Sequence, residues 1–382
     1  MPIPHRPLAK KQSNKISYHE PDKSLIYSIV LIILFGLVSL SSASSIFSYT
    51  KYGDAYYLFK HQLFGMTLGF LAFWYFSRVD YHYWKKYAFT FLIVSIGLLL
   101  LVFIPALRPD WGHARSWIEI FGMSLQPSEL VKISFLLYLA AWLEQRKDEL
   151  HDVSQGIGPF VIILGLIAFL MLLQPDIGTL SIIAITSLIV YFVGGGSMKH
   201  ILIIVMIAII IFSIMIIIKP YQQDRFKCLF NPDYSKQDIC YQTNQSLIAV
   251  ATGGLWGRGI GESRQKYLYL PEVSSDSIFA VISEEIGLIF SSILIFIYFY
   301  IFYRGYLIAK YAPDDFGKIL AIGIVSWVAI QAIINIGGII NILPMTGVPL
   351  PFISYGGSAI LAAMVAVGIL VNISKQTKIK FE

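Results

Sequence analysis

A lone acid, Asp276, stands where a polar loop turns into a long apolar run. The segment 270–280 reads Leu-Pro-Glu-Val-Ser-Ser-Asp-Ser-Ile-Phe-Ala. A carboxylate at the edge of a membrane-spanning run is costly to desolvate, so acids at such places usually serve a function. The other interpretation is a solvated loop acid just outside a helix. Asp276 is therefore the first candidate for proton-transfer chemistry in this chain.

Three more ionisable residues lie beside other apolar runs. Glu129 and Lys132 are three residues apart at the start of one run, so they share a helix face. They form either an ion pair that lets two charges enter a membrane domain or part of a polar cavity that binds substrate. Asp176 lies in a Gln-Pro-Asp turn between two other runs. Alone, it would be an ordinary turn residue.

Cations near these acids indicate a substrate that carries phosphate. Arg115, with Trp117 two residues further on, offers the paired donors that fit a phosphate group. A long polar segment before Asp276 adds further positive charge, which we expect to surround that acid. The cations of this segment are Arg225, Lys227, Arg258, Arg264 and Lys266.

The only two cysteines, Cys228 and Cys240, fall in the same polar segment. Two cysteines in one extracytoplasmic loop suggest a disulfide that closes a short ring. The alternative is a pair of free thiols, because spacing alone does not establish the geometry. No CxxC motif or histidine pair accompanies them, so a zinc site is not indicated.

The composition is that of a membrane protein. Of 382 residues, 56% are hydrophobic and only 14% are charged, whereas soluble domains carry about 25% charged residues. The mean hydropathy is +0.68. The net charge of +6 is spread over short loops and tails. Because the charges form no basic face, we expect no nucleic-acid partner.

The apolar runs predict an all-α integral membrane protein with ten transmembrane helices. One membrane domain, 24–374, lies between cytoplasmic tails at 1–23 and 375–382. A large extracytoplasmic loop, 219–276, joins the seventh helix to the eighth. The predicted spans lie near 24–46, 56–77, 86–105, 129–143, 157–173, 177–193, 199–219, 277–302, 317–340 and 358–373.

Positive charge predicts the orientation. An even number of spans puts both termini on one side of the membrane. The tails and short segments on that side hold 17 Lys and Arg residues, against three in the short loops of the other side. Both termini are therefore expected in the cytoplasm. The first run is too long for the apolar core of a cleaved signal peptide, so we interpret it as an uncleaved anchor.

A set of separated motifs, in this order, resembles the SEDS family of bacterial peptidoglycan polymerases. The resemblance covers about residues 25–374. The motifs are Arg-Ser-Trp-Ile with Gln-Pro-Ser-Glu-Leu-Val-Lys within 115–132, Gln-Pro-Asp-Ile-Gly-Thr at 174–179, Gln-Ser-Leu-Ile-Ala at 245–249, Gly-Gly-Leu-Trp-Gly-Arg-Gly-Ile-Gly at 253–261, Leu-Pro-Glu with Asp and Ile-Phe-Ala within 270–280, and Pro-Phe-Ile-Ser-Tyr-Gly-Gly-Ser at 351–358.

Two segments compare this chain in more detail with members of that family. The segment 262–272 resembles the division-type members, FtsW, more than the elongation-type members, RodA. Around its essential acid the family usually has His-Thr-Asp-Phe, whereas this chain has Ser-Ser-Asp-Ser at 274–277. The acid is retained, but its immediate packing differs.

The resemblance implies a glycosyltransferase that polymerises lipid II at the outer face of the bacterial cytoplasmic membrane, at the division septum. An α-linked donor that gives a β-linked product requires inversion, with Asp276 as candidate general base. Arg115, Lys132, the loop cations or a divalent cation (magnesium or manganese) would balance the leaving pyrophosphate. No metal-ligand spacing is visible.

The resemblance also implies partners. These are lipid II, a class B penicillin-binding protein that cross-links the new glycan, and other division proteins. Aromatic residues in the eighth and ninth predicted spans are candidate lipid-facing positions for a partner helix: Tyr298, Tyr300, Phe302 and Trp327. Aromatic residues at span ends are more often interfacial anchors.

Two other functions remain open from the sequence. A transporter that flips the same lipid-linked precursor would use Glu129 and Lys132 in a polar path through the membrane. A non-catalytic scaffold for division proteins would tolerate the loss of Asp276. Sidedness separates the first alternative from catalysis, because a flippase needs polar residues that reach both membrane faces, and here the charged candidates stop at the outer end.

Overall fold

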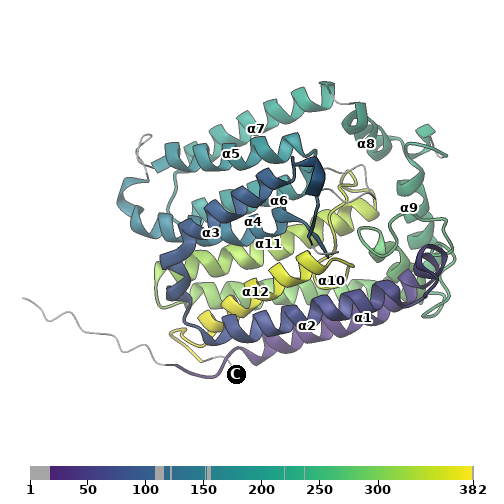
Figure 1. Ribbon diagram of the computed structural model, residues 1–382, viewed down its shortest axis with the longest axis horizontal. Coiled ribbons are helices and arrows are strands. Elements are labelled where there is room, and N and C mark those ends of the chain that lie inside the picture. Colours follow the sequence, from purple (N-terminus) through teal and green to yellow (C-terminus); the bar gives the residue numbers. More distant parts are fainter. Residues whose placement is uncertain are drawn as a thin grey trace, which may run out of the picture.

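The computed structural model describes residues 18–107, 116–120, 123–150, 152, 156–218, 220–235 and 237–380. Long helices run side by side along the horizontal axis of Figure 1. A two-stranded antiparallel hairpin precedes α4. The helices are α1 Lys23–Tyr52, α2 Tyr57–Arg78, α3 Tyr81–Leu101, α4 Pro127–Gln145, α5 Gly158–Leu173, α6 Ile177–Val193, α7 Met198–Ile218, α8 Pro220–Phe230, α9 Tyr241–Gly253, α10 Ile278–Lys310, α11 Asp315–Ile339 and α12 Gly357–Ser374, and the strands are β1 Ile118–Ile120 and β2 Met123–Leu125.

Two helices form the centre of the bundle. Most residues of α11 and α12 are buried, as expected for helices that are apolar on nearly every face. By contrast, α7 has no buried residue at all. Its apolar surface is suited to lipid contact, because a helix that is apolar all round needs either a protein core or a bilayer around it.

Small residues let α2 approach α12 closely. A Cβ added at Gly65 would lie 3.2 Å from the Cα of Gly357, and one at Gly368 would lie 2.9 Å from the backbone oxygen of Phe73. Glycines at such positions allow helix backbones to pack tightly, which is the main source of helix association in a bilayer. This packing anchors the start of α12 and the irregular segment 343–356 that precedes it.

The longest helix, α10, is interrupted at Gly287, where φ is 74°. The glycine-rich loop after α9 fills the interruption. Arg258 N–H donates to the carbonyl of Glu284, and Leu288 N–H donates to the carbonyl of Gly254. The loop thus supplies hydrogen bonds that the broken helix cannot make for itself. Gly257 and Gly287 face one another so closely that a Cβ on Gly287 would lie 2.2 Å from the Gly257 nitrogen.

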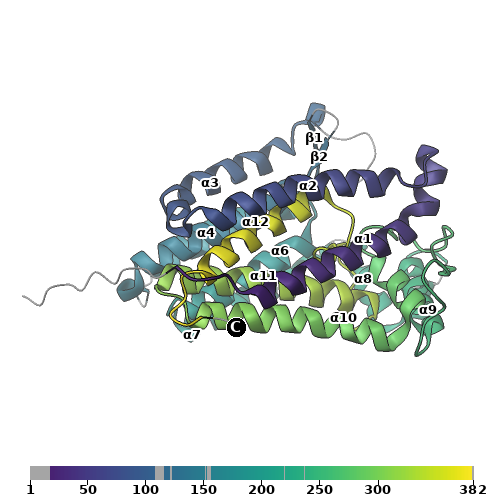
Figure 2. The ribbon, with the colours of Figure 1, turned by 90° about the horizontal axis from the view of Figure 1, so that it is seen from below.

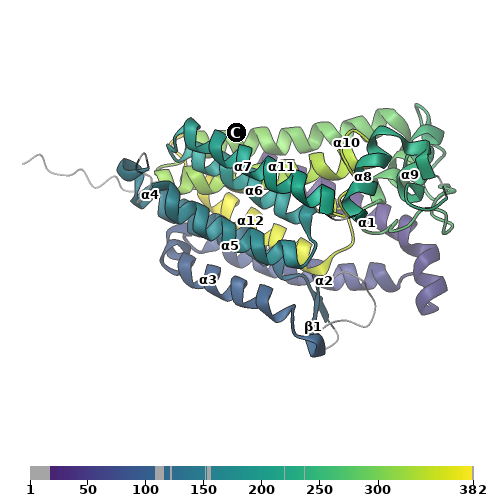
Figure 3. The ribbon, with the colours of Figure 1, turned by 90° about the horizontal axis from the view of Figure 1, so that it is seen from above.

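The irregular segments gather at one end of the bundle. Helices α8 and α9 cover this end in the views of Figures 1 and 3, and the hairpin β1–β2 lies near the end of α3 in Figure 2. The described chain ends meet elsewhere: His19 N–H donates to the carbonyl of Lys375 at 2.9 Å. Both ends of the described chain therefore lie together, as an even number of membrane crossings requires.

Each of the ten predicted ranges coincides with a helix, although some boundaries differ. Helix α3 begins five residues before the predicted start, at Tyr81, and α10 continues to Lys310. The predicted outer loop contains α8 and α9. Among the described residues, six helices are long and apolar enough to cross a membrane: α1, α3, α7, α10, α11 and α12.

The prediction of a lipid-facing aromatic surface on the eighth and ninth spans is wrong for two of its four residues. Tyr298 is buried and its hydroxyl donates to the carbonyl of Pro351. Trp327 is also buried, and its indole N–H donates to Gln331 Oε1 at 2.7 Å. Both rings carry a polar group that finds its partner inside the protein, a feature that the aromatic character alone does not reveal. Tyr300 is exposed, and Phe302 is half-buried.

Candidate active site

Asp276 lies in a tight turn immediately before α10. The turn closes on Glu272, whose carbonyl accepts the N–H groups of Ser275 and Ser277 at 3.1 Å each. The Asp276 side chain is half-buried and faces Gly347, where an added Cβ would lie 3.6 Å from Asp276 Oδ2. A glycine opposite the carboxylate leaves room beside it, and its φ of 75° suits the absence of a side chain.

The segment 343–356 and α11 hold this turn in place by hydrogen bonds. Asn335 Nδ2 of α11 donates to the carbonyl of Asp276 and to the carbonyl of Val348, both at 2.8 Å. Tyr355 N–H donates to the carbonyl of Ser274 at 2.8 Å. The uncharged final loop is thus part of the site, because its backbone fixes the backbone of the acid-bearing turn.

The surroundings of Asp276 favour its protonated form. Burial, and next the negative charge of Glu272, raise the pKa of Asp276 to about 7. A backbone hydrogen bond, the positive charge of Arg225 in α8 and the weak contact with Ser275 lower the pKa of Asp276, but these effects are smaller. A carboxyl group with this pKa is partly ionised at neutral pH and accepts a proton more readily than an ordinary aspartate.

Glu129 and Lys132 form a buried ion pair at the start of α4. Lys132 Nζ lies 2.8 Å from Glu129 Oε1, and both side chains are almost fully buried. Lys132 also donates to Gln331 Oε1 at 2.8 Å and lies 4.7 Å from the centre of the Trp327 ring. The predicted sharing of a helix face is confirmed. Neither oxygen of Glu129 accepts a well-directed hydrogen bond from the described residues, so the pair rests on charge.

Two buried amides connect this ion pair to the Asp276 turn. Gln331 and Asn335 are four residues apart on one face of α11. Gln331 accepts from Lys132 and donates to the carbonyl of Pro349 at 2.8 Å, while Asn335 holds Asp276. Sequence analysis missed both residues. The signal was present, since two amides one helical turn apart inside an apolar run are costly to bury unless they have polar partners.

Asp176 belongs to the same end of the bundle but has a structural task. Its carboxylate accepts the N–H of Thr179 at 3.1 Å and so caps α6. It also accepts from Gln126 Nε2 at 3.2 Å and from Ser128 Oγ at 3.3 Å. These contacts tie the turn between α5 and α6 to the start of α4, beside the Glu129–Lys132 pair.

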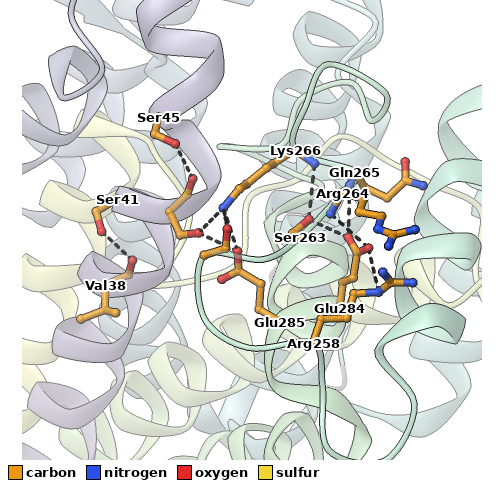
Figure 4. A network of polar contacts seen from close by, with 12 residues as sticks. Val38, Ser41, Ser45, Arg258, Ser263, Arg264, Gln265, Lys266, Glu284 and Glu285 are labelled. Atoms are coloured by element: carbon orange, nitrogen blue, oxygen red, sulfur yellow. Dashed lines mark hydrogen bonds and ion pairs between the residues drawn. The ribbon is translucent and has the colours of Figure 1, made fainter.

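The expectation that Arg258 and Lys266 surround Asp276 is wrong. Arg258 Nε lies 3.5 Å from Glu284 Oε1, and Lys266 Nζ lies 3.2 Å from Glu285 Oε1 (Figure 4). Both carboxylates are buried in α10 beside the helix interruption. Two buried acids require compensating charge, and the cations of the glycine-rich loop provide it. The adjacent acids could have indicated this pairing in the sequence.

The carboxylate of Glu284 has several partners besides Arg258. It accepts from Ser263 Oγ at 2.6 Å and from the backbone N–H groups of Arg264 and Gln265 at 3.2 Å each. Ser42 Oγ of α1 donates to Glu285 at 2.6 Å. Figure 4 shows these contacts as one network that fastens the loop to α10 and α1.

The remaining predicted site residues do not join the Asp276 turn by any contact observed. The Arg264 side chain is exposed, and Trp117 is half-buried beside β1. Arg115 lies outside the described residues. Arg225 is the loop cation whose charge acts on Asp276.

A disulfide joins Cys228 at the end of α8 to Cys240 just before α9, with a Cα–Cα distance of 5.4 Å. Of the two possibilities left open by the sequence, the structure contains the bridge. It links the two helices that cover the end of the bundle near Asp276, and through α8 it limits the positions available to Arg225.

No group of three or more His, Cys, Asp or Glu side chains that could hold a metal ion occurs in the part of the chain that the structure describes. Magnesium bound to a phosphate ligand commonly uses only one or two protein carboxylates.

Comparison with known proteins assigns the chain to a family of membrane proteins. Residues 22–379 match the FtsW/RodA/SpoVE family, described as "Cell cycle protein". The chain belongs to this family, which is the SEDS family, and is a multi-pass membrane protein. It is 36% identical to stage V sporulation protein E of Bacillus subtilis over 361 residues, covering 94% of this chain and 98% of that protein.

Relatives named for another role are equally similar. The chain is 37% identical over 367 residues to a probable peptidoglycan glycosyltransferase FtsW of Bacillus subtilis, covering 94% of this chain and 91% of that protein. It is 36% identical over 360 residues to the protein of the same name from Trichlorobacter lovleyi, covering 94% of each.

Solved structures share the fold. A chain from work on structural coordination of polymerization and crosslinking by a peptidoglycan synthase complex matches with a TM-score of 0.75 and 23% identity, covering 93% of this chain and 97% of that one. The rod shape determining protein RodA of Thermus thermophilus matches with a TM-score of 0.69 and 23% identity, covering 94% of this chain and 98% of that one.

Proposed function

We propose that this protein is a peptidoglycan glycosyltransferase that polymerises lipid II, with Asp276 as its general base. Family membership supports the reaction class. The observation that carries the assignment of the base is the half-buried carboxylate in the turn before α10, whose pKa is raised to about 7. General bases work best when their pKa lies near the operating pH.

The proposed reaction is a single inverting displacement. The Asp276 carboxylate accepts the proton of the 4-hydroxyl of one sugar. At the same time, the oxygen of that hydroxyl forms a bond to the anomeric carbon of the second sugar. The bond from that carbon to the lipid pyrophosphate breaks, and the pyrophosphate leaves with the bonding electrons. One base suffices, because inversion needs no covalent enzyme intermediate.

Positive charge must balance the departing pyrophosphate. Arg225 is favoured among the described cations, because its charge acts on Asp276. A divalent cation, magnesium or manganese, bound with the substrate would supply further positive charge at the phosphates.

We infer that all ten long helices cross the bacterial cytoplasmic membrane within one domain, 24–374, and that both tails are cytoplasmic. The segment 219–276 would then face outward, at the same membrane surface as Asp276. A Glu262→Cys variant tests this orientation, since Glu262 is exposed in that segment. Labelling by a membrane-impermeant thiol reagent from outside intact cells is expected. Labelling only after the inner face is opened would reverse the topology.

A class B penicillin-binding protein is the proposed partner, with other division proteins beside it. The support is the fold shared with a chain of a peptidoglycan synthase complex. Adding such a transpeptidase to the purified protein should increase the rate of glycan polymerisation. Equal rates with and without it would rule out activation by that partner.

The biological setting is proposed to be division at the septum. The relatives named FtsW and the segment 262–272 favour this setting, and the relative named for sporulation marks the nearest alternative. Depletion of the protein should therefore give filaments with unfinished septa. Normal division together with failed spore formation would instead assign the protein to sporulation.

The decisive experiment is polymerisation of lipid II by the purified protein in detergent or vesicles, with Asp276→Asn as the matched variant. Glycan strands should form with the unaltered protein and fall sharply with the variant. Movement of lipid II between leaflets without any glycan product would instead favour a flippase. Normal cell division with Asp276→Asn would favour a non-catalytic scaffold.

A further inference from the structure

The turn that carries Asp276 contains a second acid, Glu272, that needs explanation. Its backbone φ is 51°, in the left-handed region that residues other than glycine rarely adopt. Its carbonyl receives the N–H groups of Ser275 and Ser277, so this backbone conformation closes the turn. The Glu272 side chain is exposed, in contrast to the half-buried Asp276.

A single hydroxyl lies between the two acids. Ser275 Oγ is 2.7 Å from Glu272 Oε2 and 3.4 Å from Asp276 Oδ1. A hydroxyl has one proton to donate, and the shorter distance assigns that proton to Glu272. Asp276 Oδ1 is then left with a free lone pair on the side of the serine.

We propose that Glu272 is a positioning residue for Asp276, which closes the turn and takes the Ser275 proton so that the Asp276 carboxylate remains available as a proton acceptor. This inference rests on the proposed role of Asp276 as general base. It extends that role, because it explains how an acid in a serine-rich turn avoids being stabilised as an inert, hydrogen-bonded carboxylate.

The charged groups around Asp276 are few, which makes the effect of Glu272 measurable. The charge of Arg225 in α8 acts on Asp276 in the direction opposite to the charge of Glu272. Asp224 and Lys227 of the same helix pair with one another at 3.2 Å. Helix α9, the end of α11 beyond Gln331, and the segment 343–356 carry no residue that is charged at neutral pH. Burial raises the pKa of Tyr355 to about 12, so this tyrosine stays neutral.

The test is the pH dependence of lipid II polymerisation by the purified protein. Glu272→Gln removes the charge and frees the Ser275 proton to turn toward Asp276. Both changes favour the ionised carboxylate, so the acidic limb of the rate profile should move to lower pH by about half a unit or more. The plateau rate should also fall, because the base becomes weaker.

Two further variants separate the contributions. In the double variant Glu272→Gln with Ser275→Ala, the freed hydroxyl is gone, so the shift should be smaller than with Glu272→Gln alone. Glu262→Gln, which removes an exposed acid elsewhere in the same outer segment, should leave the profile unchanged. Thermal unfolding of each variant establishes that it is folded.

The outcomes distinguish this inference from the function on which it rests. If Asp276→Asn is inactive but Glu272→Gln keeps the original pH profile, Glu272 only closes the turn and the inference is wrong. If the double variant shifts as far as the single one, Ser275 takes no part. If Asp276→Asn polymerises lipid II at nearly the original rate, the proposed base itself is wrong.

Discussion

Two sets of acids lie within ten residues of each other, at the start of α10 and inside it, and their surroundings are opposite. Glu284 and Glu285 are buried and saturated with donors: a serine hydroxyl, backbone N–H groups, an arginine and a lysine. Asp276 is half-buried, has a backbone hydrogen bond and one weak serine contact at 3.4 Å, and lies beside another negative charge.

The difference teaches how the same functional group serves two purposes. A carboxylate with a full set of donors fixes structure, because removing any partner leaves a buried charge uncompensated. A carboxylate with few donors and a like charge nearby holds its proton more tightly and is suited to accept one. The two regions differ in burial and, more strongly, in the number of hydrogen-bond donors around each carboxylate.

The largest expected effect is on activity at the sparsely bonded acid. Asp276→Asn keeps the size of the side chain but removes the proton acceptor. A general base contributes about 10²–10⁴-fold, so lipid II polymerisation should fall by about that factor. Binding of lipid II to the purified variant should persist. A rate close to that of the unaltered protein would break the comparison and make Glu129 or Asp176 the next candidate.

The opposite result is expected at the saturated acids. Glu284→Gln replaces an acceptor of several hydrogen bonds by an amide whose NH₂ group faces donors, and it leaves Arg258 without its charge partner. The free energy of unfolding should fall by about 1–3 kcal/mol, measured by thermal or denaturant unfolding in detergent. Glu262→Gln, at an exposed acid of the same loop, is the control and should change stability by less than about 0.5 kcal/mol.

The pH dependence of stability should also distinguish the two regions. The pKa of Asp276 is raised from 3.8 to about 7, so the folded state binds this proton more tightly than the unfolded state. Ionisation then destabilises the fold progressively as the pH rises from about 4 to about 7. Asp276→Asn escapes this cost, and its melting temperature relative to the unaltered protein should be higher at pH 8 than at pH 5. The same difference at both pH values would show that Asp276 titrates normally.

The smallest expected effect concerns the disulfide. Replacing Cys228 and Cys240 together by serine opens a ring with a sequence separation of 12. By chain entropy the bridge restricts the outer segment by up to about 3 kcal/mol, so cleavage by a protease between α8 and α9 should become faster. Polymerisation should change little, because the Asp276 turn is held by α11 and the segment 343–356. A loss as large as that of Asp276→Asn would show that the bridge is needed to hold Arg225 of α8 where the reaction requires it.

The sequence predicted the positions of the long helices because apolar length is a local property. Twenty apolar residues define a span whatever lies around them, and all ten predicted ranges contain a helix. Boundaries such as the start of α3 were less accurate, since polar residues at a helix end can belong to the helix or to the loop. The ordered motifs also identify the family, and the position of Asp276 at the edge of an apolar run marks it as the first candidate for proton transfer.

The partners of the charged and aromatic residues could not be predicted in this way. Arg258 and Lys266 are close to Asp276 in sequence, but the insertion of their loop into the break in α10 directs them to Glu284 and Glu285. The sequence suggests that Trp327 is an interfacial aromatic residue, but in the structure its side chain is buried and donates to Gln331. Each pairing joins segments that only the packed bundle brings together.

The sequence by itself therefore determined that this chain is a bundle of membrane helices with an acid at the edge of one apolar run, because apolar length and local motifs encode those features. The tertiary structure alone decided which acids have several hydrogen-bond donors and which has few. That choice depends on donors supplied by distant segments, such as the glycine loop beside Glu284 and Asn335 behind Asp276. Their distances are set by helix packing and by burial, which no local pattern contains.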